Sequence, residues 1–340
     1  MLVDIYKKIK KQIENDIFEV PSVLEFHPVL NRCNLKCDWC IGQSSEECTP
    51  YYMDYELIKP FIQSAFSNDN KLYWPSEIHF CGNNSEPLLN SKFINQMCQF
   101  INNKSVIEII TNGILIDKVQ DSLLYIDKIS ISLDVFCCDE FIEKKKGSKK
   151  QYEKIWDNIY TISELKKSRT IKTMLYITFV LDKVPENIEM VDCLIGKLKK
   201  CGVNYVQFRS NYLNTDRKSE AIKKFVKELY EKFSDKGPID YTSEKQDIFY
   251  IKFNEYDYTN LTPVCYMKKI WPIITADGWI FPCAHVANHK YVDLATRVDF
   301  KENYFHFWKI NSQNITCTQY NICPSMAYAI NSICNDLSKE

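Results

Sequence analysis

Short apolar runs alternate with amphipathic stretches from about residue 22 to residue 211. The short runs have the length and the β-branched composition of buried strands, and the stretches between them repeat apolar residues at helical spacing. Asp54 and Gly202 mark a helix start and a helix end, because Asp favours the N-cap and Gly the position after the last turn. The pattern predicts strands at 23–27, 77–81, 106–111, 128–133, 173–181 and 203–209, and helices at 54–66, 91–101, 115–125, 152–165 and 187–200.

Six strands that alternate with five helices predict a parallel α/β sheet, which a doubly wound sheet and a barrel would both satisfy. The polar segments distinguish the two, because each follows the C-terminal end of a predicted strand, where α/β barrels carry their chemistry. We therefore predict a partial (β/α)6 TIM-type barrel over residues 21–215. The polar segments are 33–40, 82–87 and 111–113, then Ser132 with Asp134, and Arg209.

The flanks of this region follow other patterns. Residues 1–20 carry one apolar stripe, which predicts an N-terminal helix, and residues 216–262 are expected to form a helical connector. In 263–340, apolar runs at 270–275 and 279–282 flank Asp277-Gly278, which predicts a β-hairpin within a small C-terminal extension that also holds a helix.

Composition narrows the class of protein. A chain of 340 residues with 45% hydrophobic content can bury a sizeable core, and a net charge of −1 gives no domain-wide basic field for nucleic acid. No apolar run is long enough to cross a bilayer, and no signal-peptide core is present, so we expect a cytoplasmic protein without a membrane partner. In a cytoplasmic chain, 15 cysteines favour metal binding or buried thiols over disulfides.

Three of these cysteines, Cys33, Cys37 and Cys40, stand close together after the first predicted strand. Their spacing lets one loop turn three thiolates toward one metal centre. Structural zinc takes four ligands, and no fourth Cys or His lies at zinc-finger distance, although Cys48 could close such a site. An iron–sulfur cube also binds thiolates, and three of them would leave one iron open for chemistry.

This loop resembles the signature of the radical S-adenosylmethionine (radical SAM) superfamily, Cys-x3-Cys-x2-Cys with an aromatic residue before the last cysteine, the place that Trp39 fills. The resemblance implies the partial barrel, a [4Fe–4S] cluster on Cys33, Cys37 and Cys40, and S-adenosylmethionine on the open iron. It also implies that reductive cleavage of this cofactor yields a 5′-deoxyadenosyl radical, with flavodoxin or ferredoxin as the electron donor.

The resemblance extends to further cofactor-binding positions. Residues 82–87 look like the family's Gly-Gly-Glu-Pro segment, which meets the amino group of S-adenosylmethionine; Gly82 and Glu86 match, whereas Asn84 and Ser85 depart from it. Ser132 and Asp134 resemble the strand-four ending, whose polar groups reach the ribose and methionine moieties.

Three other polar residues on these loops are candidates for the same cofactor or for the substrate. Asn112 could add a ribose hydrogen bond. Lys146, in a run of three lysines, could hold the methionine carboxylate, with a solvated lysine face as the alternative. Arg209 could grip a carboxylate or hydroxyls of cofactor or substrate in a bidentate fork. No catalytic residue is assigned.

The C-terminal cysteines form a second set. Cys265, Gly278 and Cys283 resemble the opening of the SPASM and twitch extensions of radical SAM enzymes. The shorter twitch form implies one auxiliary [4Fe–4S] cluster on Cys265, Cys283, Cys317 and Cys323. Cys334 lies on an apolar helical stripe and is expected in the core; if it is a ligand, one of Cys317 and Cys323 is not.

Together these features predict a radical SAM oxidoreductase that abstracts hydrogen from a substrate carbon and passes an electron to the auxiliary cluster. Relatives act on sugar alcohols or on ribosomally made peptides, and the short segment before the first strand favours a small hydroxylated molecule. The alternatives are a maturase of a ribosomal peptide and a non-catalytic zinc-binding interaction protein.

Overall fold

The computed structural model describes residues 2–40, 49–83, 85–211, 220–235, 249–254, 264–287 and 293–316, with residues 330, 331, 334 and 337. Contacts group the chain into two compact units. The first contains residues 1–32, 44–108 and 257–340, and the second contains residues 33–43 and 109–256. Among the described helices, none has the length and apolar content that crossing a membrane requires.

The first unit is built on a mixed sheet with the strand order β13-β12-β11-β1-β4. Strand β1 pairs in parallel with β4 on one side and with β11 on the other. Strands β11 and β12 form the predicted hairpin, and Gly278 in its turn has a φ of +83°, a value that favours glycine. The bounds are β1 (Val23–His27), β4 (Glu77–Phe80), β11 (Ile273–Thr275), β12 (Trp279–Phe281) and β13 (Thr296–Arg297).

The side chains of β1 and β4 alternate between an apolar and a polar face. Phe26 and Phe80 pack on Phe93 of helix α3 (Ser91–Ile101), with ring centroids 6.5 and 6.1 Å apart. The other face carries buried polar residues of the same two strands, Glu25, His27, Glu77 and His79.

The helices of the first unit cover this sheet. In α1 (Leu2–Glu14), Ile5 and Ile9 are buried in one cluster with Tyr266 and Ile270. Helix α2 (Tyr55–Ala65) packs on α9 (Tyr304–Asn311) through aromatic rings. The shorter elements are β2 (Val29–Leu30), β3 (Tyr51–Tyr52), η1 (Lys71–Tyr73), η2 (Pro87–Asn90), β10 (Val264–Cys265), α8 (Met267–Ile270), η4 (Ala284–Val286) and β14 (Ile315–Thr316).

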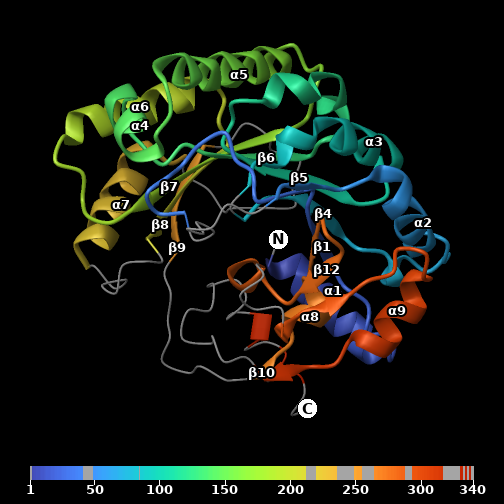
Figure 1. Cartoon of the computed structure of the whole chain (residues 1–340). Helices are drawn as coiled ribbons and strands as arrows, with labels where there is room; N and C mark the ends of the chain where they lie inside the picture. Colours follow the sequence, from blue (N-terminus) through green and yellow to red (C-terminus); the bar gives the residue numbers. More distant parts are fainter. Residues whose placement is uncertain are drawn as a thin grey trace. The chain divides into compact units, whose positions relative to one another are not determined.

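The second unit contains four parallel strands in the order β6-β7-β8-β9. Figure 1 shows α5, α6 and α7 along one side of these strands. The bounds are β6 (Lys128–Ser132), β7 (Met174–Leu181), β8 (Tyr205–Ser210), β9 (Tyr250–Asn254), α4 (Cys138–Lys145), α5 (Lys149–Lys167), α6 (Ile188–Lys200), α7 (Glu220–Phe233) and η3 (Ile116–Tyr125). Strand β5 (Val106–Thr111) contributes residues to both units.

The predicted α/β partial-barrel fold class is confirmed, and all six predicted strands are present. Two details were predicted wrongly. The connector at 216–262 is not helical throughout, because β9 extends the sheet and Tyr250 stacks on Tyr205 of β8 at 6.0 Å. Residues 116–125 form a 3₁₀ segment interrupted at Val119, where φ is −121°, instead of a regular helix. The sequence-based domain boundaries stay a prediction.

Candidate functional site

The three N-terminal cysteines lie on a turn that belongs to the second unit. The Cys40 N–H donates to the Cys37 carbonyl at 3.1 Å, which closes the turn around Trp39. Cys33 is exposed, whereas Cys37, Trp39 and Cys40 are half-buried. The thiols are therefore open to a ligand from one side and held by the protein on the other.

Helix α4 fixes the middle of this loop through its last carbonyls. The Lys36 N–H donates to the Lys145 carbonyl at 3.1 Å, and the Asp38 N–H donates to the Lys144 carbonyl at 3.0 Å. The free carbonyls at a helix C-terminus need such donors. These two bonds bracket Cys37, so the position of that thiol depends on the end of α4.

Side-chain amides hold the first part of the loop. Asn112, directly after β5, donates to Asn34 Oδ1 at 2.6 Å and to Cys33 Sγ at 3.9 Å. Gln151, in the first turn of α5, donates to the Asn34 carbonyl at 3.3 Å. The Leu35 N–H donates to Cys33 Sγ at 3.4 Å. Hydrogen bonds of this kind to a metal-bound sulfur fix the orientation of that ligand and tune the reduction potential of the metal centre.

The donor set distinguishes an iron–sulfur cube from a structural zinc site. Structural zinc takes four protein ligands, and the described part of this loop supplies three thiols. A [4Fe–4S] cube binds thiolates at its irons, so three of them would hold it and leave one iron open. The donor set therefore fits an iron–sulfur cluster.

The electrostatics of the loop centre on Cys37. Burial raises the pKa of the Cys37 thiol to about 12; Lys145 opposes this shift, and Asp134, Cys33 and Cys40 add to it. At neutral pH the metal-free thiol is therefore protonated, and a bound metal must displace the proton.

A buried ion pair lies beside this thiol at the end of β6. Asp134 Oδ2 accepts from Lys145 Nζ at 3.2 Å, and Asp134 Oδ1 accepts from the Val180 N–H of β7 at 3.1 Å. Lys145 is 1% exposed and also donates to the carbonyls of Ser132 and Leu133. Lys145 was not among the predicted site residues, although it follows the buried Phe141 by four residues and so lies on the inner face of α4.

Ser132 and Asp134 do not share one regular strand face. The N–H groups of Leu133 and Asp134 both donate to the Thr178 carbonyl at 3.1 Å, which is the pattern of a β-bulge, and Asp134 has a φ of +57°. Ser132 Oγ instead accepts from Thr178 Oγ1 at 3.4 Å. Alternation alone could not predict this change of direction, and the predicted roles of both residues toward the cofactor stay predictions.

Lys146 and Arg209 also lie in the second unit. Lys146, half-exposed, pairs with Asp38 of the cysteine loop at 3.1 Å, so the structure gives it a tethering contact. Arg209 is half-buried on β8 opposite Val180, whose N–H binds Asp134. Val180 of β7 therefore lies between the Asp134 and Arg209 positions. The ligands predicted for Lys146 and Arg209 stay predictions.

The segment that resembles the Gly-Gly-Glu-Pro motif lies in the first unit. A Cβ on Gly82 would stand 2.3 Å from the Ser85 carbonyl oxygen, so the turn admits only glycine. Glu86 is buried and accepts from the Leu88 N–H at 3.1 Å. Ser85 Oγ is buried without a hydrogen-bond partner among the described residues. A buried hydroxyl without a hydrogen-bond partner fits a turn that binds a polar ligand such as S-adenosylmethionine.

Part of the second cysteine set is described, also in the first unit. Cys265 is buried and accepts from Asn331 Nδ2 at 3.8 Å, and Cys283 is half-buried after β12. Cys334 is buried in the same cluster as Cys265; burial raises its pKa to about 12, Lys269 lowers it, and Cys265 adds to the rise. Cys317 and Cys323 lie outside the described residues, so the choice among Cys317, Cys323 and Cys334 stays open.

Buried imidazole–carboxylate pairs form a further polar group in the first unit. His27 Nε2 contacts Glu25 Oε1 at 2.8 Å, and His79 Nε2 contacts Glu77 Oε2 at 2.9 Å and Glu108 Oε2 at 3.7 Å. The nearby carboxylates outweigh the effect of burial, which lowers the pKa of His79, and raise that pKa overall. These histidines were not among the predicted site residues, since a lone histidine in a strand carries no sequence signal of its partners.

No family model and no curated sequence matches the chain. Solved structures do match. SuiB from Streptococcus suis bound to the precursor peptide SuiA aligns with 89% of this chain and 67% of its own, at 16% identity and a TM-score of 0.58. The chain has the SuiB fold. SuiB bound to S-adenosylmethionine aligns with 89% of this chain and 68% of its own, at 14% identity and a TM-score of 0.59.

A second protein shares this fold. Native anSMEcpe with bound AdoMet and the Kp18Cys peptide aligns with 86% of this chain and 84% of its own, at 16% identity and a TM-score of 0.53. The fold that the resemblance to radical SAM enzymes implies is thereby confirmed.

Proposed function

We propose that this protein is a radical SAM enzyme that modifies a peptide. The observation that carries the proposal is the Cys33–Cys37–Cys40 loop, which supplies three thiols where structural zinc takes four ligands. Helix α4, Asn112 and Gln151 hold this loop in place. Two proteins with the same fold, SuiB and anSMEcpe, were solved with S-adenosylmethionine.

When bound, a [4Fe–4S] cluster with S-adenosylmethionine supplies a radical able to abstract hydrogen from an unactivated carbon. The chain's own residues hold and tune this group. Cys33, Cys37 and Cys40 provide the thiolates, and the Leu35 N–H and the Asn112 amide donate to the Cys33 sulfur. We assign the amino group of S-adenosylmethionine to the turn at Gly82, Ser85 and Glu86, because that turn offers a buried carboxylate and a buried hydroxyl.

A peptide substrate is better supported than the small hydroxylated molecule expected from the sequence. SuiB was solved with the precursor peptide SuiA, and anSMEcpe with the Kp18Cys peptide. The length of the segment before β1 does not determine how a barrel binds its substrate. We therefore favour the peptide maturase, the alternative that the sequence left open.

We further propose that the C-terminal cysteines hold one auxiliary [4Fe–4S] cluster that moves electrons. Cys265 and Cys283 are the described members of the set, and two of Cys317, Cys323 and Cys334 complete it. Replacing each of the five with Ser in turn, and measuring iron per chain, should lower iron from about eight to about four for each ligand and leave it unchanged for the non-ligand.

The test of the function is anaerobic reconstitution followed by mass spectrometry of 5′-deoxyadenosine. We expect this product with a chemical reductant, and faster release when a low-molecular-weight extract of the source cells is added. Trypsin treatment of the extract should abolish the stimulation if the substrate is a peptide, and leave it intact if it is a small metabolite. Cys37→Ser should abolish the product, whereas Cys193→Ser, at an exposed cysteine of α6, should not.

The non-catalytic zinc protein makes the opposite prediction. Purified chain would then contain zinc without inorganic sulfide, and no reductant would yield 5′-deoxyadenosine.

A further inference from the structure

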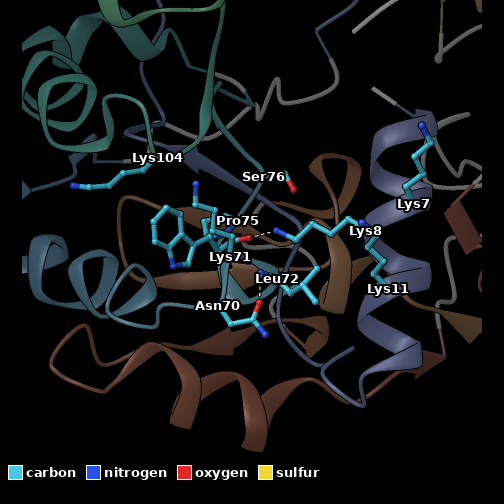
Figure 2. Close-up of a pocket in the computed structure, with 10 residues that line it drawn as sticks. Lys7, Lys8, Lys11, Asn70, Lys71, Leu72, Pro75, Ser76 and Lys104 are labelled. Carbon is cyan, nitrogen blue, oxygen red and sulfur yellow. Dashed lines mark hydrogen bonds between the residues drawn. The ribbon is translucent and has the colours of Figure 1, made fainter.

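A basic pocket lies in the first unit, with a volume of about 420 Å³. That size falls within the range of small-ligand sites. Half of its ten lining residues are lysines, and none of the ten is acidic. Figure 2 shows three of these lysines on α1 and the other two across the pocket from that helix. They are Lys7, Lys8 and Lys11 on α1, and Lys71 and Lys104 opposite.

The positive charge of this pocket has no counter-charge in the described part of the chain. None of the five lysines pairs with a described carboxylate; Lys8 donates to the Trp74 carbonyl, and Lys104 donates to the Phe100 carbonyl at 2.7 Å. Lys7 and Lys11 are four residues apart on α1, where like charges destabilise a helix by about 0.2–0.5 kcal/mol. An anionic ligand would offset this repulsion.

Among these lysines, the ammonium form of Lys8 would be stabilised most by such a ligand. Burial lowers the pKa of its amine to about 8, because the charged form has lost water without gaining a carboxylate. A carboxylate beside Lys8 would stabilise the ammonium form and reverse this shift.

The rest of the lining is apolar or aromatic. Leu72, Trp74 and Pro75 contribute carbon surface between the lysines, and Lys71 Nζ lies 5.6 Å from the centroid of the Trp74 ring. A small inorganic anion would use the cations alone. Acidic side chains would use both features, since their methylene groups can pack on the apolar surface while their carboxylates meet the ammonium groups.

We propose that this pocket binds an acidic segment of the peptide substrate through its Asp or Glu carboxylates. The inference rests on the proposed function, because it names how the same class of substrate is held. It adds a binding site of which no part belongs to the cysteine loop or to the turn at Gly82.

The test uses the full-length chain and a fluorescein-labelled peptide, Gly-(Glu)6-Gly, followed by fluorescence anisotropy. The matched probe is Gly-(Gln)6-Gly with the same label, which has the same length and no charged side chains. The test variant is Lys7→Gln/Lys11→Gln/Lys71→Gln. The matched control is Lys150→Gln/Lys172→Gln/Lys200→Gln, which removes three exposed lysines that pair with no described residue and lie in the second unit.

We expect the Glu probe to bind at least tenfold more tightly than the Gln probe, and its affinity to fall as salt rises from 50 to 200 mM. The test variant should weaken binding at least tenfold and the control less than twofold. Equal binding of both probes, displacement of the Glu probe by 1 mM inorganic phosphate, or equal loss in both variants would overturn the proposal.

The readout for the proposed function is kept separate. The test variant should still release 5′-deoxyadenosine from S-adenosylmethionine without peptide at the wild-type rate. Absence of peptide binding with this activity intact would reject the pocket alone, whereas absence of the activity in the wild-type chain would reject the function.

Discussion

Replacing Lys145 with Met tests how the end of α4 supports the cysteine loop. Lys145 is 1% exposed, and its Nζ has three oxygen acceptors, among them the Asp134 carboxylate at 3.2 Å. Removing one partner of a buried ion pair costs about 3–5 kcal/mol, because the other charge is left buried. Asp134 keeps the Val180 N–H as a donor, so we expect a loss of about 3 kcal/mol, near the lower limit.

The assay is urea unfolding of the anaerobic protein, followed by far-UV circular dichroism, together with iron per chain after reconstitution. Iron should fall as well, since the Lys36 and Asp38 N–H groups bind carbonyls of the same helical turn. Lys144→Met is the matched control: its side chain is 43% exposed and pairs with Glu140, so the expected loss is at most about 0.5 kcal/mol.

A double variant separates the ion pair from simple packing. Lys145→Met/Asp134→Asn removes both charges, and we expect it to recover at least half of the loss, because no uncompensated charge remains buried. The reasoning would be refuted if Lys145→Met unfolded within 1 kcal/mol of Lys144→Met, or if the double variant were no more stable than the single one.

Three further predictions follow from the described contacts. Gly82→Ala should lower the free energy of unfolding by about 1–3 kcal/mol and weaken S-adenosylmethionine binding in equilibrium dialysis, because the added Cβ would lie 2.3 Å from the Ser85 carbonyl oxygen. Gly196→Ala is the control: it lies inside α6, its Cβ would have its nearest neighbour at 3.9 Å, and it should raise the free energy of unfolding by about 0.5–1 kcal/mol. Asn112→Ala should make the reduction potential of the cluster more negative in an EPR-monitored titration, since it removes a donor to Cys33 Sγ; an unchanged potential would count against that role. The melting temperature should be highest between an acidic and an alkaline limit. The pKa of His79 is raised in the folded protein, so its contribution to stability is complete below the ordinary pKa of 6.5 and is lost as the pH rises through the folded pKa. Burial raises the pKa of Glu25, but His27, His79 and Trp271 together lower it below 4.5, so its contribution is present above pH 4.5 and is lost as the pH falls through the folded pKa. His79→Gln should flatten the alkaline side of that profile, and an unaltered profile would contradict the assignment.

Much of the fold could be predicted because its signals are local. A buried strand needs only four to eight apolar residues bounded by turns, and each of the six predicted strands has such a run. Asp54 was predicted as an N-cap, and its carboxylate accepts from the Glu56 N–H at 2.9 Å. The cysteine loop is equally local, since its spacing alone brings three thiols into one turn.

The features that escaped prediction depend on partners distant in sequence. Strand β9 is defined by pairing with β8, 45 residues earlier at Tyr205↔Tyr250. The bulge at Leu133–Asp134 arises from the Thr178 carbonyl of β7 and breaks the alternation that the sequence suggests. Lys145 stands in a run of three lysines that reads as a solvated face, and only the packing of α4 shows that one of them is buried.

The central claim is that the cysteine trio leaves one iron open for S-adenosylmethionine. The most direct measurement is ENDOR spectroscopy of the reduced, reconstituted chain with S-adenosylmethionine labelled with ¹⁵N at the amino group and ¹³C at the carboxylate. We predict hyperfine couplings from both labels to the cluster, and their loss in Cys37→Ser. A fully loaded N-terminal cluster whose spectrum shows no coupling to either label would contradict the account.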